Sequence, residues 1–159
     1  MIERFQFLFN ELALIFSKDR VIKKQFMLFK DYMRFRIKMS RLSFGENNQY
    51  ESFFHFKVYF PNYTLFHQLW KEIFLKEAYV FEKLEAAPRI IDVGSNFGMS
   101  VFFFKYLYPN STIIAFEPTP AIFELLKKNV EENGLQNVEV INEAIVGESG
   151  IGHVDIFVD

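Results

Sequence analysis

Apolar side chains recur every three or four positions along the first forty residues, which is the spacing of one face of an α-helix. Two such series are present, with polar and basic residues between the apolar positions. The first series is Ile2, Phe5, Leu8, Phe9, Leu12, Ile15 and Phe16, and the second is Ile22, Phe26, Phe29, Met33 and Ile37. The pattern predicts two amphipathic helices with a break near residues 17–20.

The pattern changes after the second series. Residues 43–50 are rich in turn formers and predict a loop. Residues 53–60 then alternate between apolar and polar positions, which predicts one half-buried strand. Thr64 is expected to cap a helix that ends before Pro88, because a residue that precedes proline is disfavoured in the helical conformation.

From residue 89 onward, short apolar runs rich in β-branched residues alternate with helical stretches. Strands are expected at 89–93, 112–116 and 138–141, with a weaker one at 153–158, and helices at 99–108 and between Thr119-Pro120 and Asn133-Gly134. The first of these helices is apolar almost all round, so we expect it to be buried against a sheet. The alternation predicts an α/β fold with a Rossmann-like doubly wound parallel sheet, incomplete in this chain and preceded by an α-helical N-terminal segment.

A glycine turn joins the first of these strands to its helix. Its sequence is Asp92-Val-Gly94-Ser95-Asn96-Phe-Gly98. Gly94 can adopt backbone angles that residues with a Cβ resist, and Gly98 lets the following helix lie close to the strand. The free N–H groups at the start of that helix are expected to face outward, where they would bind an anionic group.

An acidic residue follows the second strand. Glu117 comes 23 positions after Gly94, close to the spacing at which a carboxylate meets a ribose in nucleotide-binding βαβ units. The pair predicts a cofactor that contains a nucleoside. The alternative is a βαβ unit whose glycines serve only the turn. The residues after the third strand, at 142–144, are expected to lie beside the glycine turn.

The chemistry of the turn favours a cofactor smaller than a dinucleotide. Asn96 replaces the second glycine of the fingerprint G-x-G-x-x-G, which lets the backbone approach a pyrophosphate. Glu117 would also repel the 2′-phosphate of NADP. A carboxylate, a ribose and an adenine together describe S-adenosylmethionine. An NAD-dependent oxidoreductase, which would use the same acid for its ribose, is the alternative enzyme.

Three motifs resemble the FkbM-type family of S-adenosylmethionine-dependent methyltransferases. They are residues 91–98, residues 116–120 with 124–129, and residues 133–144 with Gly147, in the family's order and spacing. The resemblance covers residues 79–158. It implies a Rossmann-like class I methyltransferase that usually methylates a hydroxyl of a small-molecule acceptor, such as a sugar or a related metabolite.

The resemblance also implies roles for ten residues. Asp92, Gly94, Ser95, Asn96 and Gly98 would line the methionine portion of the cofactor, Glu117 would hold the ribose hydroxyls, Pro118 would shape that loop, and Asn142, Glu143 and Ala144 would lie near the adenine. Ser95 stands where the family more often has alanine. The family continues with a further acidic strand that this chain lacks, so the chain is either an N-terminal fragment or a protein without catalytic competence, and we expect a fragment.

Three segments are predicted: a basic helical segment at 1–44, a strand-helix lead-in at 45–88, and the N-terminal half of a methyltransferase domain at 89–159. The first holds ten Lys and Arg against four Asp and Glu, and the remainder is acidic. An acidic main domain argues against nucleic-acid binding. The basic helices predict packing on the domain or, alternatively, contact with anionic lipid or a partner, so a non-catalytic interaction module is a further alternative.

Composition excludes several chemistries. The chain has no cysteine, which excludes disulfides, thiolate metal sites and cysteine nucleophiles. His55, His67 and His153 have unrelated spacings, so no metal site is predicted. Each histidine is expected to be a surface or packing residue, and no catalytic base is predicted. No run approaches the roughly 18 apolar residues needed to span a bilayer, and no secretory signal is recognisable, which predicts a cytoplasmic protein.

Overall fold

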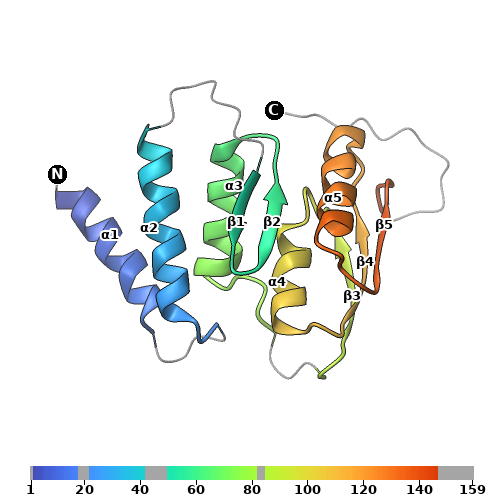
Figure 1. Ribbon diagram of the computed structural model, residues 1–159, viewed down its shortest axis with the longest axis horizontal. Coiled ribbons are helices and arrows are strands. Elements are labelled where there is room, and N and C mark those ends of the chain that lie inside the picture. The colour runs from blue at the N-terminus through green and yellow to red at the C-terminus, as the bar shows by residue number, and fades with distance from the viewer. Residues whose placement is uncertain (1, 18–21, 42–49, 82–84, 147–159) are drawn as a thin grey trace.

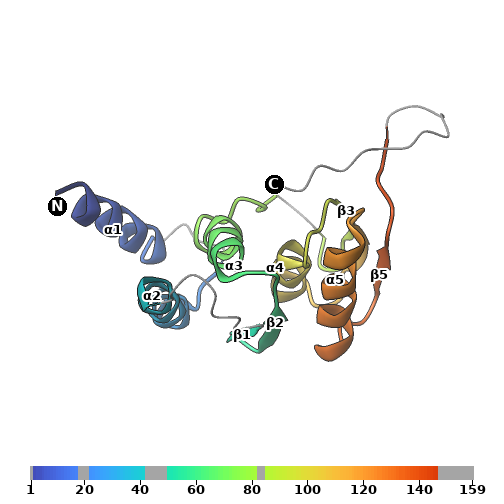
Figure 2. The ribbon, with the colours of Figure 1, turned by 90° about the horizontal axis from the view of Figure 1, so that it is seen from above.

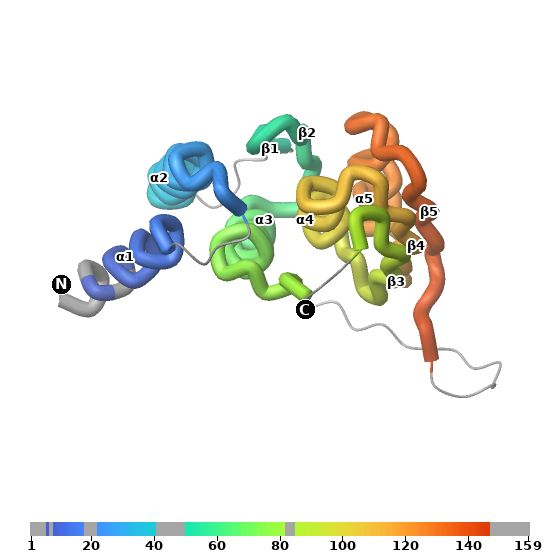
Figure 3. The backbone as a smooth tube through the Cα atoms, turned by 90° about the horizontal axis from the view of Figure 1, so that it is seen from below, coloured from blue at the N-terminus to red at the C-terminus, as the bar shows by residue number. Residues whose placement is uncertain are grey.

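The computed structural model describes residues 2–17, 22–41, 50–81 and 85–146. Its C-terminal half is a parallel sheet in the order β3-β4-β5, with strands at Arg89–Val93, Thr112–Phe116 and Val138–Ile141. Helices α4 (Met99–Leu107) and α5 (Pro120–Glu132) connect successive strands and lie on one face of the sheet (Figure 3). This arrangement confirms the predicted α/β fold and is half of a doubly wound sheet.

The two faces of this sheet are covered unequally. Ile113 and Ala115 of β4 are buried on the face that carries the helices. On the opposite face, Ile91 and Val93 of β3 are 67% and 59% exposed, and no helix of the described residues covers them (Figure 3). Within the described part of the chain, β3 is therefore an edge strand with one covered face.

The N-terminal helices form a separate layer beside α3 (Tyr63–Trp70), as Figures 1 and 2 show. Helices α1 (Ile2–Ile15) and α2 (Gln25–Arg41) confirm the two predicted amphipathic helices. Their fully buried side chains, with that of the preceding Ile22, are Ile15, Ile22, Leu28, Tyr32 and Phe35. The burial of these side chains supports the interpretation that the basic segment packs on the rest of the protein. No helix among the described residues is long and apolar enough to cross a membrane.

A β-hairpin replaces the single strand that was expected at residues 53–60. Strands β1 (Tyr50–Phe53) and β2 (Phe56–Tyr59) pair antiparallel around a turn at Phe54 and His55. Phe54 adopts a left-handed φ of 49°, which its side chain does not favour. The Phe54 ring stacks on Tyr106 of α4 with centroids 4.5 Å apart, so tertiary packing stabilises a turn that the local sequence does not predict.

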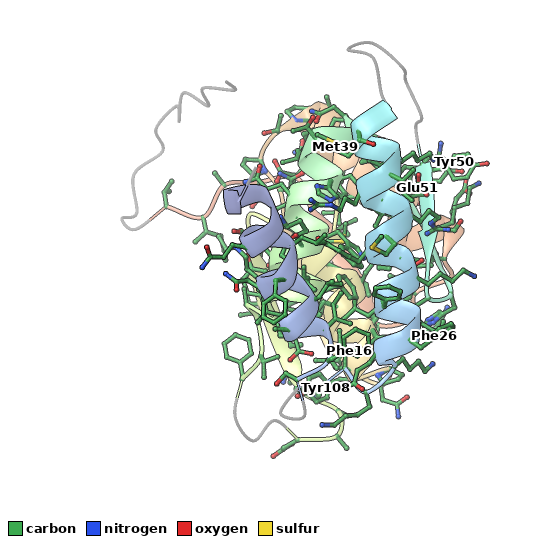
Figure 4. The ribbon with its side chains drawn as sticks, turned by 90° about the vertical axis from the view of Figure 1, so that its left-hand side faces the viewer. Phe16, Phe26, Met39, Tyr50, Glu51 and Tyr108 are labelled. Carbon is green, nitrogen blue, oxygen red and sulfur yellow. The ribbon has the colours of Figure 1, made fainter. Side chains whose placement is uncertain are left out.

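The hairpin also contacts the helices on both sides. Glu51 of β1 forms an ion pair with Lys38 of α2, and Figure 4 shows Glu51 beside that helix. After β2, helix α3 is capped by Asn62, whose Oδ1 accepts the N–H of Leu65 at 2.8 Å. The expected cap, Thr64, instead lies inside the first turn of the helix. α3 continues into the π-helical segment η1 (Lys71–Leu75).

Some predicted features lie outside the described residues. These are the loop at 43–49, most of the break between α1 and α2, the turn at 147–152 and the strand at 153–158.

Candidate functional site

Polar side chains gather where the three parallel strands end. The register pairs Val93 with Phe116 and Phe116 with Ile141, so the segments that follow β3, β4 and β5 leave the sheet at one edge. These segments are the glycine turn at 94–98, the Glu117-Pro118 tip and the residues after Ile141. Ligands of open α/β sheets bind at this carboxyl edge, which makes it the candidate site.

The N–H groups of the glycine turn are engaged within the protein. Those of Gly94 and Ser95 donate to the carbonyl oxygen of Phe116, both at 2.9 Å. The N–H of Asn96 donates to Glu117 Oε2 at 3.0 Å, that of Phe97 to Asn96 Oδ1 at 2.8 Å, and that of Gly98 to the Ser95 carbonyl at 2.8 Å. The N–H groups of residues 94–98 are therefore not available to a ligand, whereas the expectation of outward-facing N–H groups concerns the start of α4 at Met99 and stays a prediction.

Three residues of the turn adopt left-handed backbone angles. The φ values are 79° at Gly94, 50° at Asn96 and 94° at Gly98. Asn tolerates this region better than most residues with a side chain. A Cβ added at Gly98 would lie 2.8 Å from Leu126 Cδ1, so the close approach that requires glycine is to α5 rather than to the strand. A Cβ at Gly94 would meet nothing within 4 Å, which leaves open space beside the turn.

Glu117 lies at the centre of the candidate site. Its side chain is buried, with 6% of the residue exposed, and its Oε2 binds the N–H of Asn96. Its Oε1 accepts the N–H of Thr119 at 2.8 Å. Thr119 is the N-cap residue of α5, as predicted, but its own side chain forms no capping bond. A carboxylate offers about four lone-pair positions, so each Glu117 oxygen can accept a further hydrogen bond.

Asp92 is held by two serine hydroxyls. Ser100 Oγ donates to Asp92 Oδ2 at 2.6 Å, and Ser95 Oγ donates to the Asp92 carbonyl at 3.1 Å. Ser100 is buried in the first turn of α4. Sequence reasoning missed Ser100, because a serine inside an apolar helix carries no local signal of the carboxylate that it meets eight positions earlier.

The third strand adds Asn142 to the tip of β4. Asn142 Nδ2 donates to the carbonyl oxygens of Glu117 at 2.8 Å and Pro118 at 3.2 Å. Because β5 pairs with β4 and not with β3, this residue lies beside Glu117, and the expectation that it lies beside the glycine turn is wrong. Glu143 and Ala144 follow it along the exposed segment after the strand.

The described histidines lie away from this edge. The hairpin turn that contains His55 lies near the C-terminal end of α4, where Phe54 stacks on Tyr106, whereas the glycine turn precedes the N-terminal end of that helix. His67 lies on α3, where burial and the nearby positive charge of Lys71 lower its pKa to about 4. His153 lies outside the described residues. Among the described residues, no group of three His, Cys, Asp or Glu side chains is placed to hold a metal ion.

Comparisons with known proteins point to one class of enzyme. No family model matches the chain. The chain is 39% identical over 69 residues to "Methyltransferase 1" of Beauveria bassiana, an alignment that covers 43% of this chain and 28% of that protein. It is 31% identical over 93 residues to the 31-O-demethyl-FK506 methyltransferase FkbM of Streptomyces tacrolimicus, which covers 57% of this chain and 35% of the relative.

A solved structure of coclaurine N-methyltransferase, bound to N-methylheliamine and SAH, superposes with a TM-score of 0.40 at 16% identity, covering 92% of this chain and 45% of that one. Both curated relatives are methyltransferases, in agreement with the resemblance that the motifs indicate. The matched segments span only 28% and 35% of their lengths.

Proposed function

We propose that this chain carries the cofactor-binding half of an S-adenosylmethionine-dependent methyltransferase. The observation that supports this most strongly is the buried Glu117 carboxylate at the carboxyl edge of the sheet, hydrogen-bonded to the glycine turn and still able to accept further hydrogen bonds. Two vicinal ribose hydroxyls are the donors that such a carboxylate suits. The methyltransferase relatives support the same assignment.

The donor set of the turn suits an amino-acid tail better than a diphosphate. A pyrophosphate needs several free backbone N–H groups, and those of residues 94–98 are already engaged. The methionine tail instead carries an ammonium group, and Asp92 Oδ1 is an acceptor beside the oxygen that binds Ser100. Open space beside Gly94 leaves room for the tail. These features favour S-adenosylmethionine over NAD.

The proposed roles of the remaining residues follow their positions. Ser95, Asn96 and Gly98 shape the wall of the methionine pocket, and Pro118 shapes the loop beyond Glu117. Asn142, Glu143 and Ala144 would face the adenine, with Asn142 also fixing the Glu117-Pro118 carbonyl groups.

The bound cofactor supplies a methyl group that its own sulfonium activates. The residues of this chain therefore contribute by positioning: Glu117 orients the ribose, and Asp92 holds the tail. We propose a hydroxyl of a sugar or related metabolite as the acceptor; the name of the FkbM relative, a 31-O-demethyl-FK506 methyltransferase, supports transfer to an oxygen atom.

Isothermal titration of the 159-residue chain with S-adenosylhomocysteine, NAD and NADP, each in a separate experiment, tests the proposal. Saturable binding of S-adenosylhomocysteine with no binding of either dinucleotide is the expected result. Tight binding of NAD alone would replace the proposal with a nicotinamide-dependent oxidoreductase. A variant of the turn such as Asn96→Gly, which restores the second glycine of the dinucleotide fingerprint, provides a comparison in the same protein.

We also propose a peripheral contact for the basic N-terminal helices. Phe26, at the start of α2, is 78% exposed (Figure 4). The exposed basic residues Lys24 and Lys30 flank it in sequence. An exposed aromatic ring between cations suits an anionic lipid surface. Co-sedimentation with vesicles that contain or lack anionic lipid tests this contact, and binding that does not depend on salt or on lipid charge contradicts it. The cytoplasmic location and the divisions at residues 44 and 88 stay predictions.

A further inference from the structure

Two asparagines, Asn129 within α5 and Asn133 at the C-cap of that helix, bind the backbone of the β-hairpin as a neighbouring strand would. Asn129 Oδ1 accepts the N–H of Tyr59 at 2.7 Å, and Asn129 Nδ2 donates to the carbonyl of the same residue at 2.8 Å. One helical turn later, Asn133 forms the same pair with Lys57, at 2.8 and 2.7 Å. Each carboxamide thus satisfies both backbone groups of one residue of β2.

The two asparagines can bind two residues of β2 because the helical and strand repeats are similar in length. Residues four apart on a helix are separated by about 6 Å along its axis, and residues two apart on a strand by about 6.6 Å. Lys57 and Tyr59 are two positions apart on the strand, so their N–H and C=O groups point to the same side of β2, toward α5. The two carboxamides therefore cover the edge of the hairpin, which would otherwise leave unpaired backbone groups.

Only one of the two asparagines reaches the glycine turn. Asn129 Nδ2 also donates to the carbonyl of Phe97 at 2.7 Å, whereas Asn133 Nδ2 donates to the Asn129 carbonyl of its own helix, also at 2.7 Å. Asn129 is fully buried, with 0% exposed. Both N–H protons and the oxygen of its side chain are therefore committed, joining three elements: α5, the hairpin and the turn.

The Phe97 carbonyl that Asn129 binds lies between the Glu117 contact of the turn and the start of α4. Phe97 lies between Asn96, whose N–H meets the Glu117 carboxylate, and Gly98, the N-cap of α4. The first hydrogen bond of α4 runs from the N–H of Phe102 to the carbonyl of Gly98, so the Phe97 carbonyl comes before the helical series of hydrogen bonds. A buried carbonyl in that position needs a partner from elsewhere. Asn129 supplies it and thereby fixes where the turn lies relative to the hairpin.

We propose that Asn129 is a positioning residue for the cofactor turn, through which the β1–β2 hairpin becomes part of the cofactor-binding unit. Asn133 fastens the hairpin alone. The proposal rests on the function proposed above, since it assigns the turn to the amino-acid tail of the cofactor. The two asparagines form a matched pair, because each binds one hairpin residue in the same way and only Asn129 holds the turn.

The test compares Asn129→Ala with Asn133→Ala in the full chain, using two probes. S-adenosylhomocysteine has an amino-acid tail, and 5′-methylthioadenosine has the same nucleoside without the tail. Asn129→Ala is expected to weaken binding of S-adenosylhomocysteine about tenfold, equivalent to about 1.4 kcal/mol, with a much smaller effect on methylthioadenosine. Asn133→Ala is expected to lower the melting temperature and leave the ratio of the two affinities unchanged.

Hydrogen exchange of peptides that cover residues 94–98 provides a readout that needs no ligand. Exchange of the turn should accelerate in Asn129→Ala and not in Asn133→Ala. If Asn129→Ala does not fold, Asn129→Ser, whose hydroxyl can bind only one of the two carbonyls, takes its place. An unchanged affinity ratio together with unchanged exchange in the folded variant overturns the role of Asn129. Failure of the parent chain to bind S-adenosylhomocysteine would instead contradict the proposed function.

Discussion

The backbone N–H of Asn96 donates to the carboxylate of Glu117 at 3.0 Å, and this bond joins two segments that lie 21 positions apart. The turn after β3 and the tip of β4 are thereby connected directly, before any ligand is bound. The same carboxylate receives the N–H of Thr119 at the start of α5. Glu117 therefore has a structural role in addition to the ribose contact that we propose for it.

Replacement of Glu117 by alanine should weaken ligand binding and lower stability together. We expect roughly hundredfold weaker binding of S-adenosylhomocysteine, the equivalent of two hydrogen bonds to a charged group at about 1.5 kcal/mol each. The free energy of unfolding should fall by about 1–3 kcal/mol, because the N–H groups of Asn96 and Thr119 lose their partner. Calorimetric titration and urea denaturation measure the two effects separately.

Glu117→Gln is the matched control for this change. It keeps one oxygen acceptor for a turn or helix N–H but replaces the other with a donor. We expect intermediate stability and a loss of affinity close to that of the alanine variant. If a folded Glu117→Ala protein binds the ligand as tightly as the parent does, the proposed pocket is in the wrong place.

The two glycines of the turn should respond differently to alanine. Both have positive φ, but only at Gly98 would the new Cβ meet another atom, Leu126 Cδ1 at 2.8 Å. Gly94→Ala should therefore cost about 1 kcal/mol of backbone strain, and Gly98→Ala should cost about 2–4 kcal/mol, since strain and overpacking combine. Urea denaturation of the two variants measures the difference.

A double-mutant cycle separates strain from overpacking at Gly98. Shortening the opposing side chain by Leu126→Ala removes the atom that the new Cβ would meet. The cost of Gly98→Ala should then fall to about that of Gly94→Ala. A cost that stays the same in the Leu126→Ala background would mean that the close approach between the turn and α5 does not determine the need for glycine.

Much of this fold could be predicted because its signals are local. The strands at β3, β4 and β5 are short apolar runs bounded by glycine, proline or asparagine, and the helices between them begin and end at residues that favour those positions. The carboxylate tip after β4 could be placed by its distance from Gly94 alone, since a crossover helix returns the chain to the same edge of a parallel sheet.

The features that sequence reasoning missed depend on contacts between distant residues. The turn at Phe54 contains no glycine or asparagine and is stabilised by stacking on Tyr106. Asn129 meets the backbone of Tyr59 across 70 positions. Asn62 and Thr64 are both residue types that cap helices, and only the path of the chain after β2 selects the first. Such pairings leave no periodic pattern in one sequence.

The hydroxyl of Ser100 should matter for the ligand more than that of Ser95. Ser100 Oγ orients the Asp92 carboxylate at 2.6 Å, whereas Ser95 Oγ binds only the Asp92 backbone carbonyl. We expect Ser100→Ala to weaken S-adenosylhomocysteine binding roughly fivefold to tenfold, because a carboxylate that rotates freely holds an ammonium group less well. Ser95→Ala should change the affinity by less than about twofold. Equal effects of the two changes on titration would contradict the role assigned to Asp92.

The helical layer should lose stability as the pH falls, and His67 is the group responsible. Burial, followed by the charge of Lys71, lowers the pKa of His67 to about 4 in the folded chain, against 6.5 for an ordinary histidine. The negative charge of Glu11 raises the pKa of His67, and the positive charge of Arg36 lowers it further. Within the described residues, Nε2 of His67 is buried without a hydrogen-bond partner, so the folded protein holds the ring neutral.

The sign of the effect follows from proton uptake. Above pH 6.5 both the folded and the unfolded chain hold His67 neutral, and its contribution to stability is complete. Between pH 6.5 and pH 4 the unfolded chain binds a proton that the folded chain does not, so the free energy of unfolding falls. The partial exposure of the ring reduces the loss to roughly 2 kcal/mol.

His67→Gln should remove this part of the pH dependence. Urea denaturation of the parent and the variant at pH 7 and pH 4.5 measures it. Any excess in the parent's free energy of unfolding over that of the variant should shrink or reverse in sign as the pH falls. Parallel stability curves for the two proteins over that range would show that His67 is protonated as easily in the folded chain as in the unfolded one.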